Sequence, residues 1–234
     1  MIAVRLLAGA AAAWVGYAWV PHLFTPACVS RGPGTPRRIA LSFDDGPDPE
    51  WTPRVLDVLA RHGVRGSFFL VGQRAARAPA VVRAIADAGH DVENHSWSHT
   101  SLWLCGPRRT TREVGRSHAL LADLTGRAPR HFRPPWGMVN AALFPVLARQ
   151  GERCVFWSIQ PEGRRPVPAW EQAERVVRRA HAGAIVDLHD AEGTSRAPAR
   201  LVDALGPMIA RLREAGYGFA TVGELLAAPA SGLT

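Results

Sequence analysis

The sequence RIALSFDDGPDPEWTPRVLDVLARHG, residues 38–63, contains one complete strand, turn and helix pattern. The β-rich run RIALSF predicts a buried strand, and TPRVLDVLARHG has the apolar spacing of an amphipathic helix that stops at Gly63. A polar DDGP turn separates the two. The stretch therefore predicts a β/α unit whose strand ends in two adjacent carboxylates.

The same order recurs six more times towards the C-terminus. Further strands are predicted at GSFFLV (66–71), DVENH (91–95), HFR (131–133), CVFWSI (154–159), AIVDLH (184–189) and FATV (219–222). Glycine marks the end of several of the intervening helices, at Gly63, Gly89, Gly126, Gly151, Gly183 and Gly216. This repetition implies a parallel sheet, and its length fits either a β/α barrel or a doubly wound open sheet.

Polar residues gather at the carboxyl ends of these strands. They are Asp44 and Asp45, Glu93 to His95, Arg133, and His189 with Asp190. In a β/α barrel such ends share one mouth, where the active sites of barrel enzymes lie. We therefore favour the barrel over the open sheet.

Two of these motifs have chemistry that suits a metal site, and both also have ordinary structural interpretations. If the chain turns at Asp45, Asp44 and Asp45 both reach the mouth, although an Asp-Asp-Gly triplet alone is most often a plain turn. His95 and His99 in HSWSH have the i, i+4 spacing that brings two imidazoles to one face of a helical turn, or they are two surface histidines.

Four motifs together resemble the polysaccharide deacetylase family, the NodB-homology group that forms carbohydrate esterase family 4. FDDGP (43–47), HSWSH (95–99), FRPPWG (132–137) and IVDLHD (185–190) occur in the order and approximate spacing of that family, and the resemblance covers about residues 38–226. It implies a distorted, partly open (β/α)7-type barrel. The implied activity is metal-dependent removal of acetyl groups from N-acetylated, and also O-acetylated, sugars.

The resemblance also implies a role for each motif residue. Asp44 is similar to the family's general base, His189 to its general acid, and Arg133 to the residue that orients the base. Asp45, His95 and His99 correspond to the metal ligands, with zinc expected first and cobalt, nickel or manganese as alternatives. The expected substrate-binding residues are Pro135, Trp136, Gly137 and Leu188, with the Trp136 backbone N–H stabilising the oxyanion.

The acid side of the site departs from the family pattern. Family members carry an Asp in the region that reads CVFWSIQPEGRRP here, and they carry an apolar residue where this chain has Asp187. Asp187 and His189 are i and i+2 on a strand, so they face the same side, and we expect Asp187 to compensate as a further catalytic-site residue. Glu162 is the competing candidate.

The substrate class stays open between chitin-like oligomers, a cell-envelope polysaccharide such as peptidoglycan, and membrane glycolipids. A catalytically inactive glycan-binding barrel that uses Trp97, Trp103 or Trp136 is the alternative function. A non-haem iron oxygenase also uses two histidines and one carboxylate, but its usual scaffold is a β-rich jelly roll.

Residues 1–27 differ in composition from the rest, with an apolar run from Leu6 to Val20 that predicts a membrane anchor or a cleaved signal segment. Residues 28–37 are expected to form a linker and 38–234 the catalytic domain, exported on a single-pass anchor or secreted after cleavage. The net charge of +8 comes from scattered arginines, so we expect no nucleic-acid partner. Three cysteines without a CxxC pair indicate no disulfide framework, and the oligomeric state stays open.

Overall fold

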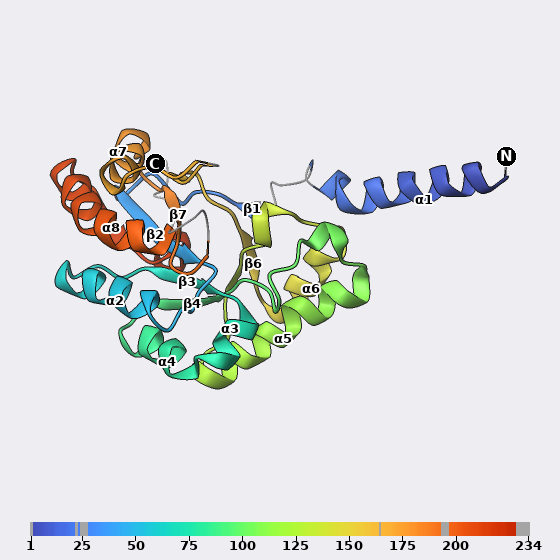
Figure 1. The fold of residues 1–234 in the computed structure, drawn as a ribbon, viewed down its shortest axis with the longest axis horizontal. Helices are drawn as coiled ribbons and strands as arrows, with labels where there is room; N and C mark the ends of the chain where they lie inside the picture. The colour runs from blue at the N-terminus through green and yellow to red at the C-terminus, as the bar shows by residue number, and fades with distance from the viewer. Residues whose placement is uncertain (1, 22, 24–27, 164, 193–196, 228–234) are drawn as a thin grey trace, which may run out of the picture.

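The computed structural model describes residues 2–21, 23, 28–163, 165–192 and 197–227, which form a curved parallel sheet surrounded by helices (Figure 1). All seven predicted strands are present, and one short strand precedes them. The strands are β1 (Cys28–Val29), β2 (Arg38–Asp44), β3 (Ser67–Leu70), β4 (Asp91–Asn94), β5 (His131–Phe132), β6 (Arg153–Val155), β7 (Ile185–His189) and β8 (Gly218–Ala220). The strand pairings are parallel, as repeated β/α units require.

Strand β2 is the centre of the sheet, whose order is β1-β6-β5-β4-β3-β2-β7 with β8 also paired to β2. β7 pairs with β2 so that Asp44 lies opposite His189. β8 and β3 share the other edge of β2, at residues 38–40 and 42–44 respectively. This register brings the carboxyl ends of β2, β3 and β7 to the same level, where the predicted site residues lie.

The sheet curves towards closure, and among the described residues two isolated bridges, in place of a ladder, join the segments after β1 and β6 to the β7 side. Arg31, after β1, forms an antiparallel bridge with Ala184, just before β7. Ile159, in the segment after β6, forms a parallel bridge with Val186 of β7. Ser158 N–H and Asp187 N–H donate to Ile185 O and Ile159 O at 3.0 and 2.8 Å. The architecture is therefore a parallel α/β sheet curled into a partly open barrel, without the continuous ladder of a closed one.

Alternate residues of β2 face two different environments. Ile39, Leu41 and Phe43 pack into the main core with side chains of the surrounding helices. Ser42 and Asp44 point the other way, into the interior of the curved sheet, where both contact the guanidinium of Arg133. The strand period of two thus separates an apolar outer layer from a polar interior that opens at the mouth.

Helices cover the outside of the sheet. They are α2 (Trp51–Arg61), α3 (Gly72–Arg77), α4 (Pro79–Asp87), α5 (Pro107–Thr125), α6 (Leu143–Gln150), α7 (Ala169–Arg179), α8 (Ala197–Glu214) and α9 (Val222–Ala227), with short 3₁₀ helices η2 (Leu102–Leu104) and η3 (Pro135–Gly137). The predicted helices are present, and α3 is an addition. The six glycines predicted at helix stops all have φ between 57° and 80°, the left-handed region that glycine adopts without a steric penalty.

The N-terminal segment differs from its predicted description. Helix α1 (Ile2–Ala18) extends away from the domain in Figure 1 and contacts it near its end, where Tyr17 Oη donates to Cys105 O at 3.1 Å. Within the described residues, no helix combines the length and apolar character needed to cross a bilayer, so the expected transmembrane helix lacks support. The expected linker, residues 28–37, contributes β1 to the sheet.

Candidate active site

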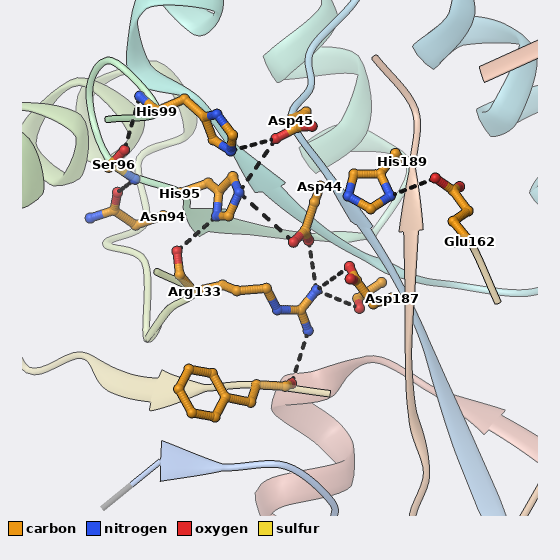
Figure 2. A network of polar contacts seen from close by, with 12 residues as sticks. Asp44, Asp45, Asn94, His95, Ser96, His99, Arg133, Glu162, Asp187 and His189 are labelled. Carbon is orange, nitrogen blue, oxygen red and sulfur yellow. Dashed lines mark hydrogen bonds and ion pairs between the residues drawn. The ribbon is translucent and has the colours of Figure 1, made fainter. Parts of the chain in front are cut away.

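The predicted site residues meet at the carboxyl ends of the strands (Figure 2). Asp44 comes from the end of β2, His95 from the residue after β4, Arg133 from the residue after β5 and His189 from the end of β7. Asp45 and His99 lie in the loops that follow β2 and β4. Parallel strands therefore place residues from four distant segments around one opening, as the barrel interpretation predicted.

The turn after β2 lets both adjacent carboxylates reach the opening. Asp44 is the last residue of β2, and Asp45 has a φ of 71°, so the strand alternation is broken between them. Gly46 follows because a Cβ there would lie 2.7 Å from Asp190 Oδ1. The turn predicted at Asp45 is confirmed, and its strained backbone is typical of a functional site.

Asp190 packs against the turn at Asp45 and Gly46. It is completely buried after β7, and its carboxylate contacts the Thr52 hydroxyl at the start of α2. Burial raises the pKa of Asp190 to about 7. The residue thus links the segment that follows β2 to the end of β7, where His189 lies.

The histidine pair lies on a loop, so the predicted helical turn is wrong. Ser96 and His99 both have left-handed φ values, of 68° and 55°. The loop is held by hydrogen bonds from Ser96 N–H to Asn94 Oδ1 at 3.0 Å and from His99 N–H to Ser96 Oγ at 3.1 Å. These local bonds, in place of helical geometry, turn both imidazoles towards Asp45.

Asp45, His95 and His99 form a cluster that fits a divalent cation. His95 Nε2 and His99 Nε2 lie 3.5 and 2.9 Å from Asp45 Oδ1, and one ligand atom from each residue lies within 4.8 Å of the others. His95 Nδ1 lies 2.7 Å from Arg133 O, so it carries the proton and leaves the Nε2 lone pair facing the cluster. Two imidazoles and one carboxylate are ligands that zinc accepts.

The electrostatics of the cluster agree with a cation site. Burial would raise the pKa of Asp45, but contacts with His95 and His99 outweigh it and hold that pKa well below its usual value. Asp45 Oδ1 is buried and, among the described residues, has no partner in good hydrogen-bond geometry. An ionised carboxylate oxygen in that position has a free lone pair for a metal.

Arg133 is a fully buried guanidinium that joins the two sides of the site. Its Nη1 donates to Asp44 Oδ1 at 2.6 Å and to Ser42 Oγ at 2.8 Å, and it lies 3.4 Å from Asp187 Oδ1. The guanidinium carbon lies 4.0 Å from the centre of the Phe69 ring. Because a buried charge is tolerated only when it is paired and hydrogen-bonded, this geometry fixes Asp44 in place.

The candidate acid His189 is paired with Glu162. His189 Nδ1 and Glu162 Oε2 lie 3.1 Å apart, an ion-pair distance, although the angle is poor for a hydrogen bond. Burial would lower the pKa of His189, but the charge of Asp187, when that carboxyl is ionised, and the contact with Glu162 outweigh it and raise that pKa well above its usual value. In Figure 2 Glu162 reaches the imidazole from the side opposite Asp44.

Asp187 belongs to a different contact network from the one predicted. Its carboxylate faces Arg133 and Asp44, whereas the carboxylate in contact with His189 is that of Glu162. Burial raises the pKa of Asp187, and the Asp44 charge beside it raises it further, so the neutral form is favoured. Asp187 can charge the imidazole only in its ionised form. The structure therefore favours the competing candidate, Glu162, as the direct partner of His189.

The site lines a cavity of about 720 Å³, which extends beyond the predicted residues. Trp136 lines it with 60% of its surface exposed, and its ring stands edge-on to His99 with centroids 4.6 Å apart. Several lining residues were not predicted from the sequence, although Trp157 lies within the predicted strand 154–159 and could have been noted. The missed residues are Trp157, Gln160, Gly163 and Glu192.

Three predicted substrate-binding residues are not among those lining the cavity. Leu188 is completely buried in the main core, because it alternates with Asp187 and His189 and faces the helices. Pro135 is buried in η3, beside the cavity-lining Trp136. Gly137 contacts Trp157, since a Cβ there would lie 3.5 Å from Trp157 Cη2. The prediction for Leu188 is wrong, and Trp136 is the member of that set in the cavity.

The fold and site define a β/α-barrel protein in which a buried carboxylate and an imidazole lie beside a cluster suited to a metal. Residues 31–181 match the model of the polysaccharide deacetylase family. The chain is 31% identical to a peptidoglycan-N-acetylglucosamine deacetylase of Bacillus cereus over 94% of its own length and 78% of that protein. It therefore belongs to the polysaccharide deacetylase family.

Other relatives show how varied this family is. A chitooligosaccharide deacetylase of Bradyrhizobium is 36% identical over 66% of this chain and 71% of that protein. The solved structure of BA3943, a family CE4 pseudoenzyme of Bacillus anthracis, has a TM-score of 0.78 and 26% identity, covering 86% of this chain and 69% of that one. A mutant of BA3943 has restored enzymatic activity. The fold thus occurs with and without catalysis, so activity is argued from the residues at the site.

Proposed function

We propose that the chain is a divalent-metal-dependent deacetylase that removes the acetyl group from N-acetylated sugars of peptidoglycan. One observation carries the proposal: a complete Asp-His-His cluster, a buried carboxylate and a carboxylate-paired imidazole line the same cavity. Hydrolysis of an amide needs a polarised carbonyl, a base for water and an acid for the leaving amine. The cavity holds a candidate for each.

Asp45, His95 and His99 would hold the metal. When bound, a divalent cation supplies Lewis-acid polarisation of the acetyl carbonyl and a lowered pKa for water, and zinc is our first expectation. The Trp136 backbone N–H is proposed as a further donor to the oxyanion, in keeping with the FRPPWG resemblance. The tight turn of η3, where Trp136 has a φ of 53°, presents this residue at the cavity.

Asp44 is the proposed general base. Arg133 occupies Asp44 Oδ1, whereas Asp44 Oδ2 faces His95 Nε2 at 3.8 Å and points towards the cluster. A water molecule attacking the acetyl carbon from the cluster side can give its proton to Oδ2. Arg133 acts as a positioning residue because it holds the carboxylate in this one orientation.

His189 is the proposed general acid, with Glu162 as its positioning residue. Because Glu162 contacts Nδ1, the proton for transfer is on Nε2, the other ring nitrogen. The raised pKa of His189 favours the protonated ring that a general acid needs. The C–N bond breaks as Nε2 gives its proton to the amine, so that acetate and a free amino sugar leave.

Peptidoglycan is the favoured substrate because a relative that aligns with nearly the whole chain is a peptidoglycan-N-acetylglucosamine deacetylase. The exposed Trp136 beside the cluster suits stacking of a sugar ring at the mouth. Chitin-like oligomers and glycolipids are the comparison substrates. The same choice of substrate leads us to propose that the domain acts outside the cytoplasm, which cell fractionation with an activity readout would test.

The direct test is acetate release from peptidoglycan, from chitin-like oligomers and from an acetylated glycolipid, using the full chain with zinc or cobalt. We expect release from peptidoglycan, and a loss of about 10²–10⁴-fold in Asp44→Asn, the range typical of general-base removal. Asp57→Asn, an exposed carboxylate on α2, is the matched control. Glycan binding without acetate release from any of the three would instead support the inactive binding barrel.

A further inference from the structure

A pair of buried cysteines joins the N-terminal strand to the barrel. β1 pairs with β6 so that Cys28 lies directly opposite Cys154. Their Sγ atoms are 2.7 Å apart, closer than sulfur atoms without a bond approach in a packed core. Neighbouring strands lie about 4.8 Å apart, which falls within the range of about 4.4–6.8 Å between Cα atoms that disulfides span.

The surroundings of the two sulfur atoms are apolar. Cys28 and Cys154 are 8% and 2% exposed and belong to a core cluster with Phe132, Val146 and Leu147. Burial raises the pKa of Cys154 well above its usual value, and the Cys28 thiol beside it adds to the effect. Cys154 therefore lacks the exposed, acidic character of a catalytic or redox-sensing cysteine, and Cys28 is buried beside it.

We propose that Cys28 and Cys154 form a structural disulfide that ties β1 to β6. Each thiol loses a proton, and the two sulfur atoms lose two electrons to a disulfide-containing oxidant, such as oxidised glutathione or a thiol–disulfide oxidoreductase, which is reduced to two thiols. An S–S bond replaces the two S–H bonds. Because the folded thiols are buried, the bond forms while the chain folds and is then protected from reductants.

The location of this bond gives it a structural purpose. β1 is only two residues long, yet it connects the N-terminal segment to the barrel. β6 leads directly to Trp157 and Glu162, which line the cavity. A disulfide between these strands fixes the N-terminal segment to the barrel. It also stabilises β6, the strand that precedes Glu162, the partner of His189. Such bonds persist in oxidising compartments, so the bond also fits an exported domain.

Thiol counting tests the proposal without any substrate, so its outcome is independent of the proposed function. The full chain is exported into an oxidising periplasm, purified without reductant, incubated with oxidised glutathione, denatured and titrated. We expect one thiol, that of Cys105, three after reduction, and a cross-linked peptide joining residues 28 and 154. Any other count before reduction, or a cross-link that includes Cys105, overturns the proposal.

Thermal unfolding separates a structural bond from an incidental one. Reduction should lower the melting temperature of the unmodified chain by about 5–15 °C, as expected for a bond that closes a long loop. Cys105→Ala, which removes the third buried cysteine, is the matched control and should keep this response. Cys28→Ala should lose it. An equal response to reductant in Cys28→Ala would contradict the structural role.

Discussion

The two halves of the active site are built in different ways. On the metal and base half, the four side chains come from two short motifs, and left-handed backbone at Asp45, Ser96 and His99 turns the metal-binding loops inward. On the acid half, His189 ends a regular strand, and its carboxylate partner comes from the segment after β6. Local turns position the first half, whereas tertiary packing positions the second.

Arg133 is where the halves meet, since it contacts both Asp44 and Asp187. The two halves therefore differ in how much sequence change their geometry tolerates. The metal and base half depends on backbone conformations that few substitutions preserve. The acid half depends on one carboxylate near one imidazole, and a carboxylate can reach the same place from another position, here Glu162.

Metal removal should have the largest effect on acetate release. Dialysis against a chelator should reduce acetate release by about 10³-fold or more, equal to about 4 kcal/mol, because the Lewis acid is lost. Zinc or cobalt should restore the activity. His95→Ala should match the chelated protein, and His62→Ala, at the end of α2, should behave normally. Full activity after chelation would remove the basis for the metal half.

Replacing Arg133 should have the next largest effect, on stability. Arg133→Met leaves Asp44 buried without its cation, and breaking a buried ion pair in this way costs about 3–5 kcal/mol of unfolding free energy. Arg54→Met removes a surface pair with Glu50 and should cost less than about 1 kcal/mol. Urea unfolding measures both. If Arg133→Met left the free energy of unfolding almost unchanged, Arg133 would not be the residue that couples the two halves of the site.

The fold was largely predictable because its signals are local. Strand runs, helix periods and the stop glycines each depend on a few neighbouring residues, and every predicted strand is present. Helix α3 was not predicted because its sequence, GQRAAR, is too short to show an apolar period. The end of α1 contacts the barrel through long-range bonds, which composition does not reveal.

The site was predictable in its residues more than in its contacts. The spacing of His95 and His99 suggested a helical turn. The segment is a loop instead, because Ser96 and His99 adopt left-handed backbone that the sequence pattern does not indicate. Leu188 could have been rejected, since a strand that turns Asp187 and His189 inward turns Leu188 outward. The Glu162 contact and the Cys28 and Cys154 pair join segments far apart in the sequence, so only the fold reveals them.

Glu162→Gln tests the acid half directly. Activity requires protonated His189, so it falls as pH rises through the pKa of that residue. Removing the Glu162 charge lowers the pKa of His189, which moves the alkaline limb of the pH–rate profile to lower pH and reduces the rate at neutral pH by about 10-fold. Glu162→Asp should recover part of the shift.

The matched control for this variant is Glu192→Gln. Glu192 also lines the cavity, but it pairs with Arg74 at the surface, so its replacement should leave the limb in place. A pH–rate profile of kcat/KM for both variants makes the comparison. An unshifted alkaline limb in Glu162→Gln would show that Glu162 does not raise the pKa of His189.

Asp187→Asn should have the smallest effect on activity. It distinguishes the role of Asp187 from that of Glu162. Because burial and Asp44 favour the neutral form of Asp187, an amide replaces it with little change near neutral pH, and kcat should stay within about threefold. A carboxyl whose pKa is raised on folding stabilises the fold at low pH and loses that contribution as pH rises through its folded pKa. The variant should therefore gain stability relative to the unmodified chain as pH increases above about 4, measured by urea unfolding over a pH series. A downward shift of the alkaline limb as large as that of Glu162→Gln would show that Asp187 is ionised and charges His189 itself.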